Sequence, residues 1–207
     1  MDADADIVET VASGGRDIEI ARPRDAAALI DEDAFGDDEF LPYWAELWPS
    51  GVALAREVLG RSLRGARVLD LGAGLGTAAV AAALAGGRVL ATDWSEDALA
   101  FTRANAERNG AKLETLHADW SAPGPLLDRA PFDLVLAADV VYERRNVEML
   151  APLLPRLTRE VWLADPGRPF LPDFLAAIAA DWTVESRPAP DAPKVTLHRL
   201  RLRGRGV

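Results

Sequence analysis

Residues 66–76 read Ala-Arg-Val-Leu-Asp-Leu-Gly-Ala-Gly-Leu-Gly and are the most informative part of the chain about its fold. A short apolar run that ends in glycines is typical of a buried strand that turns directly into the next element. The alanine-rich segment 75–85 follows and stops at Gly86-Gly87, which predicts a helix. Glycines at such a turn let the backbone approach a bound nucleotide without Cβ clashes, and the helix N-terminus adds N–H donors. The stretch therefore predicts a strand, a ligand-binding loop and a helix in immediate succession.

The same rhythm continues to the end of the chain. Ser50 and Ser95 are placed to cap the helices that begin after them. We expect helices at 51–60, 75–85, 95–109, 146–158 and 170–180. We expect strands at 66–71, 88–92, 112–117, 132–138, 160–164, 182–186 and 195–202. Strands that alternate with helices form a parallel sheet covered on both faces, so the predicted class is α/β.

The segment that precedes this rhythm has a different character. Residues 7–20 alternate around Ser13-Gly14-Gly15, which predicts a β-hairpin. Six acidic residues follow between 31 and 39, either as a solvated loop or as an acidic rim that attracts a cationic substrate. We therefore divide the chain into an N-terminal extension, residues 1–41, and a main domain, residues 42–207.

The composition excludes several classes of function. The 207 residues include 33 acidic and 23 basic side chains, and a net charge of −10 disfavours nucleic-acid binding. There is no cysteine and only two histidines, His117 and His198, so we expect no disulfide, thiolate nucleophile or metal site. No apolar stretch is long enough to span a membrane, and the acidic start Met1–Asp6 lacks the positive charge of a targeting peptide. We expect a cytoplasmic protein with neither nucleic acid nor membrane as its partner.

The residues around the glycines indicate which ligand the loop holds. Asp93 ends the next predicted strand, where a carboxylate can accept both hydroxyls of a ribose. A dinucleotide site would show a third glycine where Thr77 stands, and Asp70 would repel a pyrophosphate. S-adenosylmethionine has no phosphate and carries a cationic sulfonium and an ammonium, which acidic and aromatic groups suit. The charge pattern favours this methyl donor.

From about Pro42 to its end, the chain resembles the seven-β-strand S-adenosylmethionine-dependent methyltransferases. It is most similar to the branch of protein lysine methyltransferases that pair a tryptophan before the glycines, here Trp48, with Asp-x-x-Tyr after the fourth strand, here 139–142. Residues 42–44 and 165–169 also resemble the electron transfer flavoprotein β-subunit lysine methyltransferases and their bacterial relatives. The resemblance implies a Rossmann-like, doubly wound, mostly parallel seven-stranded sheet with an antiparallel C-terminal strand. It also implies S-adenosyl-L-methionine as cofactor and S-adenosyl-L-homocysteine as product.

The resemblance further implies which residues contact the cofactor. The glycine loop would line its methionine part, Asp93 its ribose, and Trp120 and Asp119 its adenine, while Trp48 would close the pocket. Simple core packing is the alternative for the two tryptophans. The full implied set is Trp48, Asp70, Gly72, Ala73, Gly74, Asp93, Trp94, Asp119, Trp120 and Ala138.

Asp139 and Tyr142 are the implied catalytic residues. They follow a strand at its carboxyl end, the side on which ligands bind in open α/β sheets. Methyl transfer is an in-line displacement that needs a neutral, well-placed amine, and a lysine starts near pKa ~10.4. Asp139 could orient that amine and take part in its deprotonation, and Tyr142 could offer an oxygen or a ring face. The alternative is that Asp139 caps a turn and Tyr142 packs beneath it.

Weaker candidates surround this pair. Trp44 and Glu46 are expected to shape the acceptor channel. Asp165 and Arg168 either touch the acceptor or form a rigid loop with a local ion pair. We expect packing or structural roles for Tyr43, His117 and His198.

The sequence thus predicts a protein lysine methyltransferase whose substrate exposes a lysine, such as the electron transfer flavoprotein β subunit or a ribosomal protein. Methylation of a small molecule or of another nitrogen is the first alternative, because one fold hosts many acceptors. A nucleotide-binding oxidoreductase and a non-catalytic module that keeps the fold are the others.

Overall fold

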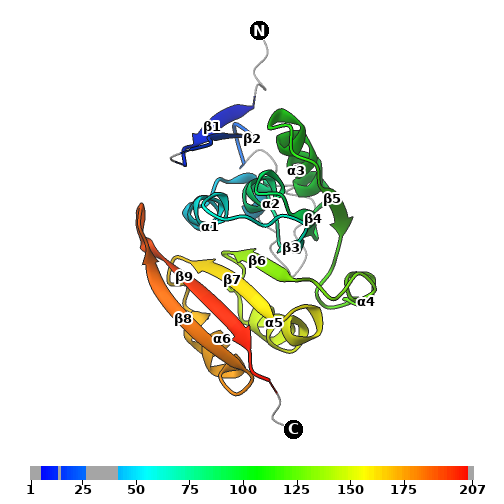
Figure 1. Cartoon of the computed structure of the whole chain (residues 1–207), viewed down its shortest axis with the longest axis vertical. Coiled ribbons are helices and arrows are strands. Elements are labelled where there is room, and N and C mark those ends of the chain that lie inside the picture. The colour runs from blue at the N-terminus through cyan, green and yellow to red at the C-terminus, as the bar shows by residue number, and fades with distance from the viewer. Residues whose placement is uncertain (1–5, 14, 27–41, 205–207) are drawn as a thin grey trace.

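A seven-stranded sheet forms the centre of the molecule (Figure 1). The computed structural model describes residues 6–13, 15–26 and 42–204. Within them the strand order is β5-β4-β3-β6-β7-β9-β8, with β3 to β7 parallel and β9 antiparallel to both of its neighbours. The strands are β3 (Arg67–Leu71), β4 (Arg88–Asp93), β5 (Glu114–His117), β6 (Leu134–Ala138), β7 (Glu160–Asp165), β8 (Trp182–Ala189) and β9 (Ala192–Leu202). The predicted doubly wound sheet with its antiparallel C-terminal strand is confirmed.

Helices cover both faces of this sheet. One apolar core packs α1, α2 and α3 against one face, and a second packs α4, α5 and α6 against the other. The helices are α1 (Pro49–Leu59), α2 (Thr77–Leu84), α3 (Glu96–Arg108), α4 (Gly124–Leu127), α5 (Arg144–Leu157) and α6 (Leu171–Ile178), preceded by the 3₁₀ turn η3 (Tyr43–Ala45). Since the central strands are buried on both sides, they read as continuous apolar runs rather than as alternating ones.

The N-terminal residues form the expected hairpin, β1 (Ile7–Val11) with β2 (Ile18–Arg22). Two side-chain amides, one on α3 and one on the residue that caps its C-terminus, pair with the backbone of β2. Asn105 accepts from the Ala21 N–H at 2.7 Å and donates to the Ala21 carbonyl at 2.9 Å. Asn109 repeats the pattern on Glu19, at 2.9 and 2.7 Å. These bonds fasten the hairpin to the C-terminal part of α3. The acidic stretch 31–39 lies outside the described residues.

Two local predictions were wrong. Ser50 does not cap α1, because the helix begins one residue earlier at Pro49, with Trp48 in the cap position. Proline suits the first turn of a helix since its missing N–H would have no helical partner there. The C-terminal strands are also longer than predicted, because Pro188 lies in β8 at the edge of the sheet, where a strand tolerates a proline.

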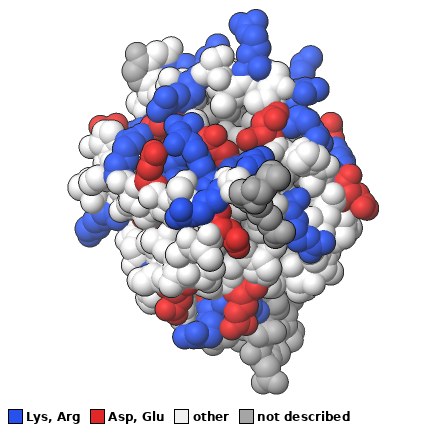
Figure 2. All heavy atoms as spheres, turned by 60° about the horizontal axis from the view of Figure 1, so that its bottom comes forward, with Lys and Arg blue, Asp and Glu red and all other residues white. Residues whose placement is uncertain are grey.

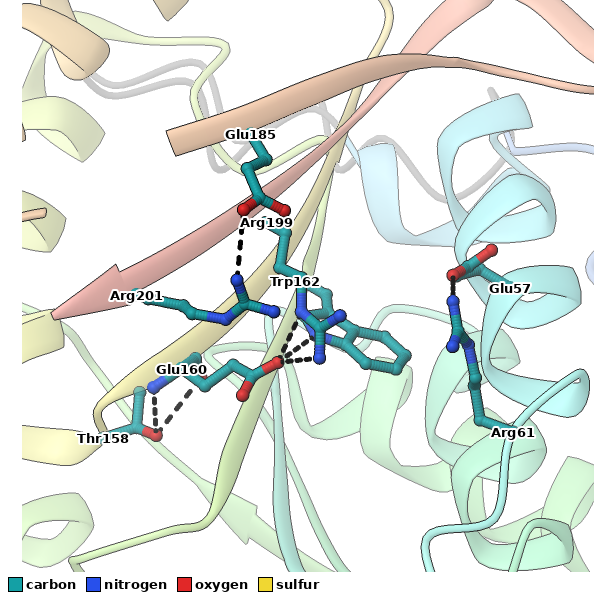
Figure 3. A network of polar contacts seen from close by, with 8 residues as sticks. All are labelled: Glu57, Arg61, Thr158, Glu160, Trp162, Glu185, Arg199 and Arg201. Carbon is teal, nitrogen blue, oxygen red and sulfur yellow. Dashed lines mark hydrogen bonds and ion pairs between the residues drawn. The ribbon is translucent and has the colours of Figure 1, made fainter. Parts of the chain in front are cut away.

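Ion pairs and a stacked tryptophan hold the C-terminal strands and α1 together (Figure 3). The guanidinium groups of Arg61 and Arg199 lie 6.0 and 5.3 Å from the ring centroid of Trp162 on β7. Glu160 accepts from the Trp162 indole at 2.8 Å and from Arg199 at 2.7 Å. Figure 2 shows basic and acidic side chains interspersed on the face toward the C-terminus, in keeping with such pairing. Among the described helices none is long and apolar enough to cross a bilayer.

Candidate functional site

A cavity of about 470 Å³ opens where the parallel strands end at their carboxyl termini. Its wall is built from the residues that follow β3, β4, β5, β6 and β7, closed on one side by η3 and the start of α1. The structure brings all twelve predicted site residues to this one cavity. They are Trp48, Asp70, Gly72, Ala73, Gly74, Asp93, Trp94, Asp119, Trp120, Ala138, Asp139 and Tyr142.

The glycine loop forms the floor, and its conformation requires glycine. Gly74 and Gly76 have φ values of 54° and 77°, in the left-handed region that favours glycine. A Cβ on Gly76 would lie 2.8 Å from the Thr102 side chain of α3. The Thr102 hydroxyl in turn donates to the Gly74 carbonyl at 2.9 Å. The loop is therefore pressed against α3, with its backbone turned toward the cavity.

Asp93 ties this loop to the end of β4. Its Oδ2 accepts from the Gly74 N–H at 2.9 Å, and its Oδ1 accepts from the Ser95 N–H at 3.0 Å. Burial raises the pKa of Asp93, while these N–H donors act in the opposite direction. Each carboxylate oxygen keeps a lone pair beyond the backbone bond, so Asp93 can still accept from a ligand hydroxyl.

Asp70 has one carboxyl oxygen without a hydrogen-bond partner beside the same loop. The side chain is 2% exposed, and its Oδ2 has no hydrogen-bond partner among the described residues. Burial raises the pKa of Asp70 to about 7, a shift that the backbone bond from Ala79 opposes and the nearby Asp93 increases. An orphaned buried carboxylate oxygen costs free energy unless a donor or cation meets it. The cavity thus fits a ligand that brings a cationic group to Asp70.

Two tryptophans line the side of the cavity that is formed by the residues after β4 and β5. Trp120 lies against the loop, since a Cβ on Gly72 would come within 3.3 Å of its ring. Trp94 is 47% exposed, and its carbonyl is bonded to the His117 ring at 2.6 Å. Asp119 is exposed, and hydrogen bonds from Ser121 lower its pKa. A flat apolar ligand portion with a donor at its edge would suit this wall.

The opposite end of the cavity is dominated by Asp139. Its φ of 58° is the only positive value among the described non-glycine residues. Its N–H donates to the Ala164 carbonyl of β7 at 2.9 Å, which continues the pairing of the two strands. Arg168 binds both carboxylate oxygens, from Nε at 2.6 Å and from Nη2 at 2.9 Å. A local ion pair within the loop after β7 was one of the two expectations for Arg168. Arg168 instead pairs with Asp139, which follows β6.

Tyr142 lies in an aromatic and amide environment near this pair. Its ring meets the ring of Tyr43 at a centroid distance of 5.4 Å and an angle of 58°. The Asn146 side chain is within hydrogen-bonding reach of Tyr142 and donates to the Val140 carbonyl at 3.0 Å. Burial, and then the charge of Glu143, raise the pKa of Tyr142, so its hydroxyl is neutral at physiological pH. Tyr43 packs against Tyr142, as expected, and it is 42% exposed where it lines the cavity.

Sequence reasoning gave too little weight to three residues that shape the site. Arg168 stood among the weaker candidates, and Asn146 and Thr102 were not considered. Asn146 and Thr102 are buried polar residues on predicted helices, a pattern that indicates a specific hydrogen-bond partner. No group of three or more potential metal ligands occurs within the described part of the chain.

The comparisons with known proteins agree with this geometry. The sequence pattern that describes lysine methyltransferases matches residues 43–161, more than half of the chain. The chain belongs to the lysine methyltransferase family. It is 38% identical over 136 residues to the electron transfer flavoprotein β-subunit lysine methyltransferase of Xenopus laevis, covering 61% of this chain and 53% of that protein. It is 39% identical over 123 residues to the ribosomal protein L11 methyltransferase of Thermus thermophilus, covering 59% and 44%.

This member of the family spans about half the length of the relatives it matches. Its fold also resembles that of solved methyltransferases. The 16S rRNA N2 G1207 methyltransferase of T. thermophilus superimposes with a TM-score of 0.69 at 18% identity, over 96% of this chain and 51% of that one. The matched pattern begins at Tyr43 and includes η3, the glycine loop, Asp93 and the Asp139–Tyr142 segment.

Proposed function

We propose that the protein is an S-adenosylmethionine-dependent methyltransferase that acts on the side-chain amine of a lysine in another protein. One observation carries the proposal. In a chain of the lysine methyltransferase family, a single cavity joins the orphaned Asp70 carboxylate and Asp93 at one end to Asp139 and Tyr142 at the other. That arrangement supports a site for a cationic nucleoside beside a site for an amine.

S-adenosylmethionine supplies an electrophilic methyl group on a sulfonium, which an amine displaces in line. The protein's task is to hold both partners. Asp70 offers a carboxylate oxygen to the ammonium of the methionine part, and the backbone at Gly72 and Gly74 allows close contact because neither residue has a Cβ. Asp93 accepts from the ribose hydroxyls, and the rings of Trp94 and Trp120 border the adenine.

On the acceptor side, Asp139 lies where it can accept an N–H bond and so orient the lone pair of the amine. The Tyr142 hydroxyl is neutral and offers a second hydrogen-bonding oxygen. Trp48 and Tyr43 surround this end with ring faces, which favour a cationic or methylated amine. Holding the amine in line contributes to rate by proximity alone.

The relatives suggest candidate acceptors. Proteins named for methylation of the electron transfer flavoprotein β subunit and of ribosomal protein L11 both match this chain, so we propose these two acceptors for testing. A protein acceptor, a cytoplasmic location and the absence of a nucleic-acid or membrane substrate belong to the same proposal.

Transfer of labelled methyl from S-adenosylmethionine into a cell extract, resolved on a denaturing gel, tests the function. We expect a discrete protein band with the unmodified enzyme and with Asp128→Asn, which changes an exposed carboxylate outside the cavity. We expect a much weaker band with Asp93→Asn when S-adenosylmethionine is held below saturation. Label confined to the low-mass fraction would instead indicate a small-molecule enzyme. Binding of NADH in place of S-adenosylhomocysteine would indicate an oxidoreductase.

A further inference from the structure

Arg168 forms an ion pair with Asp139 within the candidate site. Its Nε and Nη2 donate to the two oxygens of Asp139 at 2.6 and 2.9 Å, a bidentate, charge-assisted pair. The Asp139 side chain is 6% exposed and that of Arg168 is 31% exposed. A pair this well aligned fixes the plane of the carboxylate as well as its position.

The guanidinium is itself held from two further directions. It lies 5.3 Å from the ring centroid of Trp48, within the range of a cation–π contact. The backbone beneath it is pinned by Asp165, whose Oδ1 accepts from the N–H groups of Gly167 and Arg168 at 2.7 Å each. Arg168 therefore reaches Asp139 from a rigid turn, not from a freely moving loop.

The backbone at Asp139 shows that its placement is imposed. A φ of 58° is unfavourable for a residue with a side chain, although aspartate and asparagine tolerate it better than most. Strained residues of this kind persist only where the surroundings fix them, and they cluster at functional sites. The strand bond to Ala164 and the pair with Arg168 are the contacts that fix this one.

The pair with Arg168 leaves Asp139 able to accept further hydrogen bonds. A carboxylate has about four lone-pair positions, and Arg168 uses two of them. The remaining positions can accept an N–H from an amine in the cavity, in a direction set by the guanidinium. The arrangement suits a fixed hydrogen-bond acceptor for the incoming amine.

We propose that Arg168 is a positioning residue for methyl transfer. Its guanidinium, supported by the turn after β7 and by the ring of Trp48, holds the Asp139 carboxylate in the orientation that receives the acceptor amine. This rests on the proposed function, because the amine is the substrate proposed above. Nothing in the proposal requires Arg168 to touch the cofactor, so binding of S-adenosylhomocysteine should be independent of it.

Kinetics of Arg168→Ala and Arg168→Lys test the proposal. We expect Arg168→Ala to lower kcat by about 100-fold, the scale of a misplaced reacting group, while S-adenosylhomocysteine affinity stays within about twofold. Arg168→Lys should recover little, because an ammonium cannot bind two oxygens in one plane. Millimolar guanidinium chloride should restore part of kcat in Arg168→Ala but not in Asp139→Asn. Arg144→Ala removes an exposed arginine outside the cavity wall and should match the unmodified enzyme.

Three outcomes would overturn the proposal: near-normal kcat in Arg168→Ala, loss of S-adenosylhomocysteine binding in that variant, or a failure of guanidinium to restore activity. A second measurement does not depend on catalysis. The Nε–H signal of Arg168 in a nitrogen-15 correlation spectrum should exchange slowly with solvent and shift in Asp139→Asn. An unchanged signal would also refute the pairing, whereas an intact signal with no methyl transfer by the unmodified enzyme would refute only the proposed function.

Discussion

Asp70 and Asp93 flank the same glycine loop, but their hydrogen bonding differs. Both oxygens of Asp93 accept from backbone N–H groups, so neither oxygen lacks a hydrogen-bond partner within the protein. Asp70 keeps one buried oxygen without a partner. A group left unsatisfied in the folded protein costs stability and marks a place where a ligand compensates. Asp70 is thus expected to lower the stability of the unliganded protein and to increase its affinity for a cation.

The raised pKa of Asp70, about 7, predicts a pH dependence of stability. When the pKa of a carboxyl is higher in the folded than in the unfolded protein, the folded protein becomes less stable as pH rises from about 4 through 7. Asp70→Asn removes this loss. At pH 8 its free energy of unfolding should therefore exceed that of the unmodified protein by up to about 4 kcal/mol, and at pH 5 the difference should be smaller. Urea unfolding at both pH values measures it. An equal difference in unfolding free energy between the two proteins at pH 5 and pH 8 would contradict the raised pKa of Asp70.

The same substitution should weaken cofactor binding. If the ionised carboxylate meets an ammonium, affinity for S-adenosylhomocysteine should rise between pH 6 and 8 in the unmodified protein and stay flatter in Asp70→Asn. Titration calorimetry across that range measures the difference. A steep rise that survives in Asp70→Asn would place the pH-sensitive group elsewhere.

Asp93→Asn should cost more affinity than the matching change at Asp119. An asparagine can accept only one of the two backbone N–H bonds, so one donor loses its partner. We expect S-adenosylhomocysteine affinity to fall by about 10- to 100-fold, which corresponds to a lost charged hydrogen bond. Asp119→Asn, at an exposed position on the rim, should cost less. Equal losses in the two variants would argue against the anchoring role of Asp93.

At the scale of elements, α3 organises both the glycine loop and the N-terminal hairpin. Thr102 contacts the loop at Gly74 and Gly76, and Asn105 donates to the Leu75 carbonyl at 2.9 Å as well as to Ala21. One helix face thereby joins β2 to the cofactor loop through side-chain amides and a hydroxyl. Changes on this face should affect the stability of both.

Gly76→Ala tests the contact between loop and helix. The new Cβ would clash with Thr102 and would also pay the cost of a positive φ. Gly110→Ala is the matched control, since Gly110 has a φ of 63° and no atom near the position of a Cβ. We expect about 1 kcal/mol of destabilisation at Gly110 and roughly 2–4 kcal/mol at Gly76, measured by urea unfolding. Similar values at the two sites would show that the loop yields to the extra methyl.

Asn105→Ala tests the link to the hairpin. Asn105 is fully buried, and its loss would leave the Ala21 N–H and two carbonyls without their partner. We expect a loss of about 2–4 kcal/mol in the free energy of unfolding, against about 1 kcal/mol for the more exposed Asn109→Ala. A larger loss in Asn109→Ala than in Asn105→Ala would mean that water replaces the hydrogen bonds of Asn105 to the backbone.

In the molecule as a whole, the central strands and the glycine loop were predictable from local sequence, whereas the antiparallel C-terminal strand and the roles of Asp139 and Tyr142 were expected from the family resemblance. A strand, a glycine turn and a helix lie within residues 66–85, and the carboxyl ends of parallel strands meet at one edge. The bond between Asp139 and Arg168 was not predictable, because it joins residues 29 apart whose approach depends on the turn after β7. The start of α1 was missed because Pro49 begins the helix without a side-chain cap.

Identification of the methylated amino acid shows whether the enzyme acts on a lysine amine held by Asp139. The band labelled from S-adenosylmethionine would be hydrolysed, and its labelled amino acid separated beside the product of an Asp139→Asn reaction. We expect label in Nε-methylated lysine, and we expect Asp139→Asn to lose this label while it still binds S-adenosylhomocysteine. Label in any other amino acid, or undiminished label with Asp139→Asn, would contradict it.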